Sequence, residues 1–216
     1  MNVLAFDCAT GPTSVAVRRD GELAARADDA RPQGQAESLV PLIGAVLQQA
    51  GIAPAALDRI AVTLGPGSFT GVRIAIAAAR GLALALGRPV FGYSSLDVMA
   101  AALPPSDLPT LVAIDARRGE AYVRLFAADG PALTPPFALP LDDAAARLPG
   151  GDLRLAGSGA PLVATRLGDR ARVVLPDVVP DAAVLALMAE GAAPEHGLIT
   201  PEPLYLRPPD AKLPGA

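Results

Sequence analysis

The chain contains an internal repeat, and this repeat limits the fold more than any other feature of the sequence. The first copy is centred on Asp7 and Gly11, and the second is centred on Asp115 and Gly119. In each copy an apolar run ends in Asp, a turn passes through Gly, and an apolar return segment follows at the same spacing. Self-similarity of this kind predicts two related lobes, each of which begins with a strand, a turn and an antiparallel strand.

Each copy places a carboxylate at the end of a strand, beside a turn with free backbone N–H groups. Two such lobes facing each other would form a cleft in which phosphates and a metal ion can bind between the turns. Asp is also common in ordinary hairpin turns, so one copy alone is better explained by a structural role. The matched spacing favours duplication. The candidate residues of the cleft are Asp7, Thr10, Gly65, Gly67, Ser68 and Asp115.

A Pro-rich segment at residues 104–107 separates the copies and predicts an N-terminal lobe at 1–103 and a C-terminal lobe at 104–216. The Pro-rich tail from Pro201 onward is expected to lie extended along the surface. Apolar patterns predict strands at 3–6, 14–18, 22–27, 59–64, 89–93, 110–114, 120–127, 153–156 and 172–175. They predict helices at 36–50, 72–86, 95–103, 141–148, 161–167 and 181–192.

The composition is that of a folded globular chain, with 51% hydrophobic and 19% charged residues. The net charge is −4 and Lys212 is the only lysine, so no basic cluster for gripping nucleic-acid phosphates is evident. A single cysteine, Cys8, is typical of a reducing compartment. There is no leader pattern, and the most apolar stretch, residues 72–86, is shorter than the ~20 residues of a membrane span. We therefore expect a cytoplasmic protein without a membrane segment.

The densest motif is Gly65-Pro-Gly-Ser-Phe-Thr-Gly71, which lies between a predicted strand and a predicted helix. Glycines followed by Ser68 and Thr70 as candidate N-caps are typical of an anion site at a helix N-terminus. The motif lacks the Lys-Ser/Thr pair of a phosphate-binding Walker loop and the glycine spacing of a dinucleotide fingerprint. A phosphate loop and a purely structural tight turn therefore both remain open.

The helix predicted at 72–86 has only two charged residues, Arg73 and Arg80, which share one narrow stripe because they are seven positions apart. The other faces carry Ala, Ile, Leu and Gly. A helix that is apolar nearly all round is either enclosed within its own fold or covered by a partner chain. The composition does not distinguish between these two alternatives.

Residues for catalysis by a metal ion or a nucleophile are scarce. His196 is the only histidine and lies in a loop-like segment, so a transition-metal site or a Ser–His–Asp triad is not expected. Cys8 follows Asp7 at a predicted strand end and is expected to be a buried structural thiol. The sequence thus predicts no metal ligands and no catalytic residues.

Five segments, taken in order, resemble the TsaB family, which is also called YeaZ. They are residues 3–10, 36–43, 65–73, 115–122 and 203–210, and the glycine motif at 65–71 is the most specific of them. The resemblance covers nearly the whole chain. It implies an α/β, two-lobed actin/sugar-kinase/Hsp70-like fold (ASKHA, RNase H-like) with duplicated βββαβαβα-type lobes, in agreement with the repeat.

The resemblance also implies a function. The family supplies a subunit of the bacterial machinery that makes N6-threonylcarbamoyladenosine at position 37 of tRNA. Such a subunit is a non-catalytic scaffold that binds and activates the catalytic subunit TsaD, which carries a metal-binding His pair on the helix corresponding to residues 36–50. The present chain has no His there. TsaE, an ATPase, and TsaC, which makes the threonylcarbamoyl-adenylate, are further implied partners, and tRNA is reached only through the complex.

No cofactor of the chain's own is expected; ATP or ADP and Mg would belong to the complex. By resemblance, the helices at 36–50 and 72–86 would dock against the same helices of TsaD, and the isolated chain would form a homodimer. The predicted interface residues are Leu39, Leu42, Ile43, Val46, Val72, Ile76, Ala79 and Ala83.

Two enzymatic alternatives remain. One is an ATP-dependent phosphotransferase of the sugar-kinase type that uses Asp7 and Asp115 to hold Mg²⁺ and phosphates. The other is a peptidase, an older label of the family, against which the single histidine argues.

Overall fold

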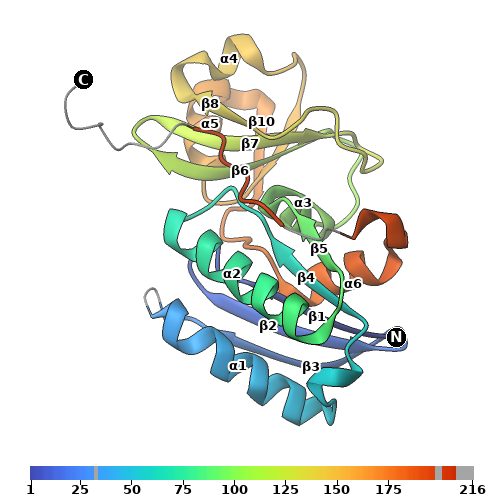
Figure 1. The fold of residues 1–216 in the computed structure, drawn as a ribbon. Coiled ribbons are helices and arrows are strands. Elements are labelled where there is room, and N and C mark those ends of the chain that lie inside the picture. Colours follow the sequence, from blue (N-terminus) through green and yellow to red (C-terminus); the bar gives the residue numbers. More distant parts are fainter. Residues whose placement is uncertain (32–33, 198–200, 208–216) are drawn as a thin grey trace, which may run out of the picture.

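The computed structural model describes residues 1–31, 34–197 and 201–207, and these form two lobes, each built on one five-stranded sheet (Figure 1). The strand order is β3-β2-β1-β4-β5 in the first sheet and β10-β9-β6-β7-β8 in the second. Read from opposite ends, the two orders are the same. This is the predicted two-lobed α/β fold of the actin/sugar-kinase/Hsp70 type, in which each lobe follows the βββαβαβα sequence of elements.

The first lobe contains β1 (Asn2–Asp7), β2 (Thr13–Arg19), β3 (Glu22–Asp29), α1 (Gln35–Ala50), β4 (Arg59–Thr63), α2 (Phe69–Leu86), β5 (Val90–Tyr93) and α3 (Ser95–Ala101). The second contains β6 (Thr110–Arg117), β7 (Glu120–Phe126), β8 (Phe137–Pro140), α4 (Ala144–Arg147), β9 (Leu153–Ala156), α5 (Ala160–Leu167), β10 (Ala171–Leu175) and α6 (Ala182–Gly191). Short 3₁₀ turns lie at Pro54–Ala56, Leu141–Asp143, Gly168–Arg170 and Pro194–His196.

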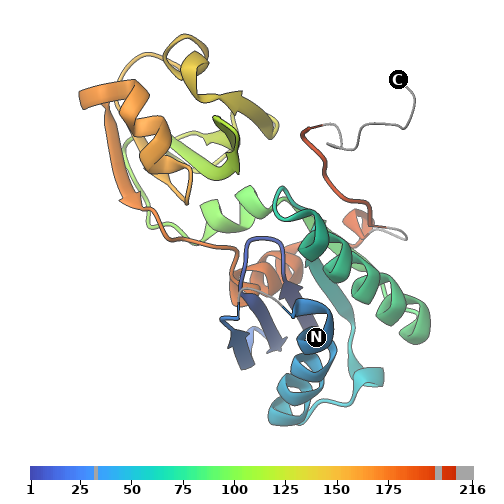
Figure 2. The same cartoon turned by 90° about the vertical axis from the view of Figure 1, so that its left-hand side faces the viewer.

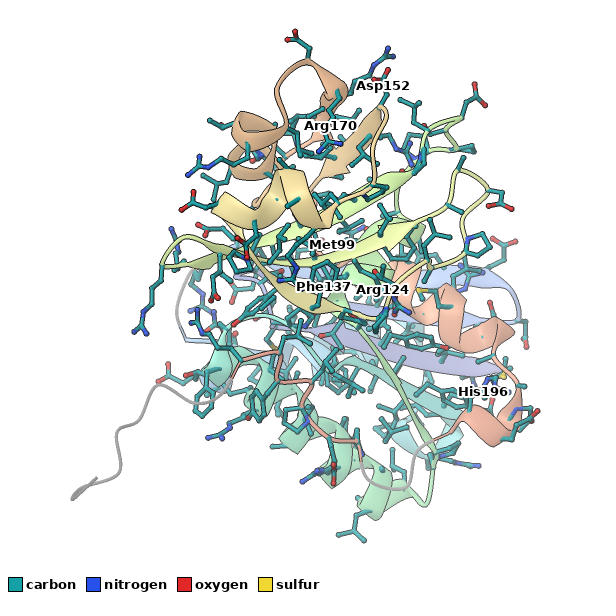
Figure 3. The ribbon with its side chains drawn as sticks, turned by 90° about the horizontal axis from the view of Figure 1, so that it is seen from above. Met99, Arg124, Phe137, Asp152, Arg170 and His196 are labelled. Atoms are coloured by element: carbon teal, nitrogen blue, oxygen red, sulfur yellow. The ribbon has the colours of Figure 1, made fainter. Side chains whose placement is uncertain are left out.

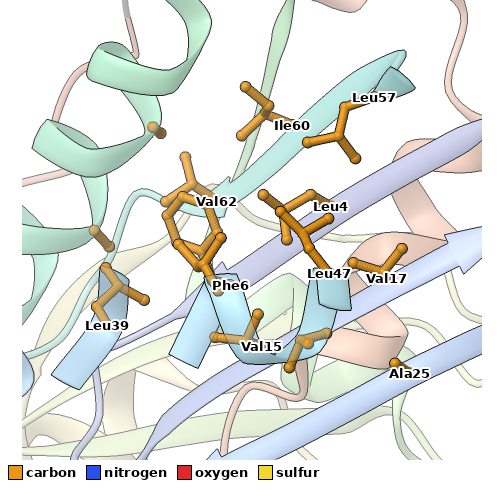
Figure 4. Close-up of a cluster of buried hydrophobic side chains, with 14 of the residues drawn as sticks. Leu4, Phe6, Val15, Val17, Ala25, Leu39, Leu47, Leu57, Ile60 and Val62 are labelled. Atoms are coloured by element: carbon orange, nitrogen blue, oxygen red, sulfur yellow. The ribbon is translucent and has the colours of Figure 1, made fainter. Parts of the chain in front are cut away.

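Strand β1 is the centre of the first lobe, because helices cover both faces of its sheet. Its alternate residues point to opposite faces: Leu4 and Phe6 pack under α1 and α2, whereas Val3 and Ala5 face α6. A strand buried on both faces reads as a continuous apolar run, as observed in the sequence. Figure 4 shows Leu4 and Phe6 with the neighbouring side chains of β2, β4 and α1 in this core.

The third helix of each lobe packs against the opposite lobe. From the first lobe, α3 places Leu96 and Met99 against Val112 of the second sheet. From the second half of the chain, α6 places Leu185 and Ala189 against the first sheet. Figure 1 shows α6 beside the strands of the lower lobe, far from β10, which precedes it in the chain. The predicted lobe at 104–216 therefore differs from the packing, since α6 belongs to the first sheet by its contacts.

An ion pair accompanies each exchanged helix. Asp97 of α3 accepts from Arg124 Nη1 of β7 at 2.5 and 2.6 Å. Glu190 of α6 accepts from Arg18 Nε of β2 at 2.8 Å. The two arginines lie on equivalent strands, so each lobe holds the helix of the other in a similar manner.

Most predicted elements are present, but the second lobe shows two differences. Strand β8 was not predicted; its sequence follows Pro135 and Pro136, and it forms one edge of the second sheet. The predicted helix at 141–148 is a 3₁₀ turn followed by the four-residue α4. Neither β8 nor the short α4 could be recognised from the apolar pattern, because both are short and prolines lie beside them.

Helix α2 begins three residues earlier than predicted, at Phe69, because Ser68 Oγ caps it by accepting from Gly71 N at 2.9 Å. Its 18 residues and apolar composition would by themselves allow it to cross a membrane. In the fold one face is buried against the first lobe through residues such as Val72, Ala75 and Ile76. Packing of this kind is that of a helix within a folded domain.

Candidate functional site

A cavity of about 970 Å³ lies between the lobes. Its walls include the β1–β2 turn, the loop between β4 and α2, the β6–β7 turn and the segment 201–207. Of the six residues predicted for this cleft, Thr10, Gly67, Ser68 and Asp115 line the cavity, whereas Asp7 and Gly65 do not. The two copies of the sequence repeat therefore do face each other, as predicted.

The glycine loop is packed tightly against the β1–β2 turn. A Cβ atom at Gly67 would lie 2.2 Å from Ala9 O, and one at Gly71 would lie 1.9 Å from Cys8 O. Ser68 N donates to Ala9 O at 2.6 Å, so this N–H group is used within the chain. The glycines are required because two backbone segments approach each other closely. This geometry favours the structural interpretation of the motif over a phosphate loop.

Asp7 lies below the cavity floor rather than in its wall. Its side chain accepts hydrogen bonds from Ala9 N at 3.1 Å and from Thr63 Oγ1, and the residue is only 1% exposed. Burial raises the pKa of Asp7 to about 6, and the two hydrogen bonds oppose this shift only in part. A carboxyl group so enclosed does not present oxygens to a metal ion in the cavity.

Asp115 occupies the equivalent place in the second lobe and reaches the cavity. Its carboxylate accepts from Arg117 N at 2.8 Å and pairs with Arg117 Nη1 at 3.1 Å. Its own backbone N–H donates to Ser158 Oγ at 3.1 Å. Arg117 thus neutralises the one predicted cleft carboxylate that lines the cavity.

The rest of the cavity wall is largely apolar, with Val72, Met99, Ile114 and Val178 among its residues. Thr10 Oγ1 is buried and has no hydrogen-bond partner among the described residues. The residues that the structure describes contain no group of three or more His, Cys, Asp or Glu side chains that could hold a metal ion. The residues present therefore do not fit the Mg²⁺-phosphate site that a sugar-kinase-type phosphotransferase needs.

Most of the predicted partner-interface residues are buried in the chain's own core and do not reach its surface. The buried set comprises Leu39, Ile43, Val46, Val72, Ile76 and Ala79, each at most 4% exposed. Leu42 and Ala83 are half-buried against the same core. These side chains form the inner stripes of α1 and α2, which already cover the first sheet.

The outer side of the same two helices is apolar and exposed. We call it the α1/α2 face; it comprises Val40, Pro41, Gly44 and Ala45 of α1 with Ala77, Gly81, Leu84 and Ala85 of α2. Val40 is 64% exposed and Leu84 is 87% exposed. An apolar groove of about 260 Å³ runs between the helices, lined by Val40, Ile43, Ala78, Gly81 and Leu82. The helices lie side by side at the outside of the lobe (Figure 1).

Sequence reasoning missed a second glycine loop. After β9, Gly157-Ser158-Gly159 approaches β6, and Gly159 N donates to Ala113 O at 3.0 Å, much as Ser68 N donates to Ala9 O. A Cβ atom at Gly157 would lie 2.4 Å from Ala113 O. The available signal was the Gly-x-Gly pattern within two residues of the end of the fourth strand of each lobe, at Gly65 and at Gly157.

His196 and Cys8 lie outside the cavity. His196 lies in an exposed 3₁₀ turn, and Figure 3 shows it at the periphery of the molecule, whereas Met99 and Arg124 lie near its centre. Cys8 is buried, and burial raises the pKa of its thiol to about 12. The expectation that Cys8 is buried is therefore confirmed.

A family model described as "TsaD: tRNA N6-adenosine threonylcarbamoyltransferase" matches residues 33–147, which is more than half of the chain. The matched region runs from α1 through the second hairpin to α4. It includes both the α1/α2 face and the first glycine loop.

Relatives and solved structures that are similar to this chain include proteins named TsaB and YeaZ. The tRNA threonylcarbamoyladenosine biosynthesis protein TsaB of Escherichia coli is 40% identical over 56% of this chain, and the alignment spans only about half (53%) of that protein. An uncharacterised Mycobacterium tuberculosis protein is 37% identical over 97% of this chain and 93% of its own length. The structure of YeaZ from Pseudomonas aeruginosa is 32% identical, covers 95% of this chain and 99% of its own, and has a TM-score of 0.81.

Proposed function

Because the chain belongs to the TsaB (YeaZ) family, we propose that it takes part in forming threonylcarbamoyladenosine in tRNA as a non-catalytic subunit. In this proposal it binds a TsaD-type transferase and activates it. The pathway is supported by the relatives, since TsaB of E. coli is named for threonylcarbamoyladenosine biosynthesis and the family model is that of the transferase. The observation that carries the proposed binding to a partner is the exposed apolar α1/α2 face.

The α1/α2 face has the properties of a docking surface. From Gly81 to Leu86 the helix α2 carries no charge, and small residues on both helices permit close approach of another helix pair. Covering Leu84 completely would contribute roughly 1.5–3 kcal/mol, and Val40 would add to this. Exposed apolar surface across two helices is expected to find a partner. The buried stripes of α1 and α2 support this face from beneath rather than contacting the partner themselves.

The chemistry of the chain supports a non-catalytic role. With His196 as its only histidine, the sequence cannot supply a His pair on α1 or anywhere else. Asp7 is enclosed and Asp115 is paired with Arg117. We therefore assign ATP or ADP, Mg and catalysis to other members of the complex, with TsaE and TsaC as functional partners. Cytoplasmic location and tRNA contact through the complex belong to the same proposal.

Reconstitution tests this role directly. TsaC, TsaD and TsaE are mixed with unmodified tRNA, threonine, bicarbonate and ATP, with or without this chain, and threonylcarbamoyladenosine is quantified by mass spectrometry. We expect modification to require this chain, and we expect the chain without TsaD to produce none. Unchanged modification in its absence would overturn the proposal.

A substitution pair tests the docking surface within this assay. Leu84→Glu places a charge at the centre of the α1/α2 face, and we expect it to reduce binding to TsaD at least roughly 100-fold while leaving the unfolding temperature unchanged. Leu162→Glu is the matched control, since Leu162 is an exposed leucine on α5 of the second lobe. Equal binding by both variants would show that the partner docks elsewhere.

The match to the transferase model favours one alternative, in which this chain transfers the threonylcarbamoyl group itself. The same reconstitution separates the two, because omission of TsaD would then leave modification intact. The absence of any His pair in the sequence weighs against this alternative.

A further inference from the structure

Residues 201–207 cross the mouth of the inter-lobe cavity and contact both lobes; we call them the strap. Leu204, Tyr205, Leu206 and Arg207 line the cavity. Figure 2 shows the strap on one side of the molecule and the chain that descends from β10 to α6 on the other. The strap therefore adds a link between the lobes where no other chain connection passes in the described part of the structure.

The strap is bound to the first lobe through Pro201 and Leu204. Arg80 donates to Pro201 O through Nε at 3.0 Å and through Nη2 at 2.6 Å. Leu204 N donates to Leu64 O at 2.7 Å, directly after the end of β4. Leu204 O would lie 3.3 Å from a Cβ atom at Gly65, so that glycine makes room for the strap.

An aromatic contact fixes the middle of the strap to the N-terminus of α2. The rings of Tyr205 and Phe69 stack with centroids 5.8 Å apart and planes 27° apart. The guanidinium of Arg73 lies 3.6 Å from the Phe69 ring centroid and donates from Nε to Tyr205 OH at 2.8 Å. Such a stack combines ring contact with a cation–π interaction.

The end of the strap is bound to the second lobe. Arg207 Nη1 donates to Glu120 Oε2 of β7 at 2.8 Å, and both side chains are only about one-quarter exposed, at 25% and 27%. The same nitrogen lies 3.5 Å from Ala116 O of β6. This charge-assisted contact is the strap's anchor across the cavity mouth.

The only charged residues of α2 are Arg73 and Arg80. The two arginines of this otherwise apolar helix both bind the strap. The α2 residues of the α1/α2 face lie outside this arginine stripe and are exposed.

We propose that the strap is an inter-lobe clamp that sets the opening of the cavity and the orientation of α2 relative to the second lobe. The other links between the lobes include the chain from α3 to β6, the packing of α3 with its Asp97–Arg124 pair, and the chain between β10 and α6. In this proposal the lobes pivot about these links. The strap stops this pivoting because it holds the opposite side of the cavity mouth. Release of Arg207 from Glu120 opens the cavity. This inference does not depend on the proposed function.

The test measures the distance between the lobes in the full chain. Cysteines are introduced on exposed positions of each lobe, Ala45→Cys on α1 and Ala146→Cys on α4, while native Cys8 is fully buried. Spin labels are attached to the two cysteines, and the distribution of distances between them is measured by double electron–electron resonance. Arg207→Glu breaks the anchor, and Arg207→Glu with Glu120→Arg restores it with the charges exchanged. Arg166→Glu is the matched control, because Arg166 pairs with Asp142 within the second lobe.

We expect Arg207→Glu to broaden the distribution and shift it to longer distances, the charge-exchanged variant to return it, and Arg166→Glu to leave it unchanged. Hydrogen exchange gives a second measurement on the same proteins. Exchange of residues 64–73 should become roughly tenfold faster in Arg207→Glu, while β6 keeps its protection and shows that the fold is intact. If the strap exchanges faster but the distance distribution is unchanged, the strap is a surface segment only and the clamp is overturned.

Discussion

Asp7 and Asp115 occupy equivalent places in the two lobes, but the lobes use them differently. Asp7 is buried beneath the glycine loop with Thr63 and Ala9 as hydrogen-bond partners, whereas Asp115 faces the cavity and pairs with Arg117. The backbone around them is duplicated, with an antiparallel hairpin and a glycine loop in each lobe. Duplication has therefore preserved the architecture while the chemistry of each lobe has diverged.

The largest effect is expected where the lobes are most alike. Gly67→Ala and Gly157→Ala each place a Cβ atom within 2.4 Å of a backbone carbonyl oxygen, so backbone segments must move apart. We expect each to lower the free energy of unfolding by about 3 kcal/mol or more, measured by urea denaturation. Gly81→Ala is the control, since its Cβ meets nothing within 4 Å and α2 should gain up to about 1 kcal/mol.

A tolerated change at one glycine and a damaging change at the other would break the equivalence of the two loops. Tolerance at both would show that neither loop approaches its hairpin closely in solution.

The burial of Asp7 should make the stability of the chain depend on pH. The pKa of Asp7 is raised by burial from 3.8 to about 6, so folding favours its protonated form. Its contribution to stability is therefore fully present below about pH 4 and is lost as the pH rises through about 6. Relative to Asp7→Asn, the native chain should lose about 3 kcal/mol of unfolding free energy between about pH 4 and about pH 8.

Asp115→Asn is the matched control at the equivalent position. Because Asp115 faces the cavity and its partner Arg117 is 85% exposed at the side chain, we expect this substitution to change the free energy of unfolding by less than about 0.5 kcal/mol. Parallel curves for the native chain and Asp7→Asn would contradict the raised pKa of Asp7.

A smaller effect should distinguish the two exchanged helices. Hydrogen bonding to Arg18 lowers the pKa of Glu190, whereas burial raises the pKa of Asp97 despite its pairing with Arg124. The first carboxylate is therefore stabilised in the fold and the second is not. We expect Glu190→Gln to cost about 1 kcal/mol and Asp97→Asn to cost less than about 0.5 kcal/mol at neutral pH, measured by thermal unfolding. A larger cost for Asp97→Asn than for Glu190→Gln would contradict this difference between the two carboxylates.

The repeat around Asp7 and Asp115 was sufficient to predict two lobes, and the apolar periods located nearly all helices and strands. Strand β8 escaped because prolines precede it and it is only four residues long. The exchange of α3 and α6 could not be predicted, because the choice of sheet is made by tertiary contacts and not by local sequence.

The site was harder to predict than the fold. Periodicity identified the apolar positions of α1 and α2, but a helix apolar on several sides does not reveal which side covers its own sheet. Residues such as Val46 and Ala79 were therefore placed at a partner surface although they are buried, while Val40 and Leu84 were overlooked. Arg73 and Arg80 gave a clear stripe, but their binding to the strap depends on a segment far away in the sequence.

The packing of α6 on the first sheet has a consequence for synthesis of the chain. The ribosome releases the first five strands early, yet the helix that covers Val3, Ala5 and Ala61 is made only after the entire second sheet. Until then, that face of the first sheet has only Val98 of α3 from the earlier helices in its buried cluster and lacks α6. The N-terminal lobe is thus the first to be made and cannot be the first to be finished.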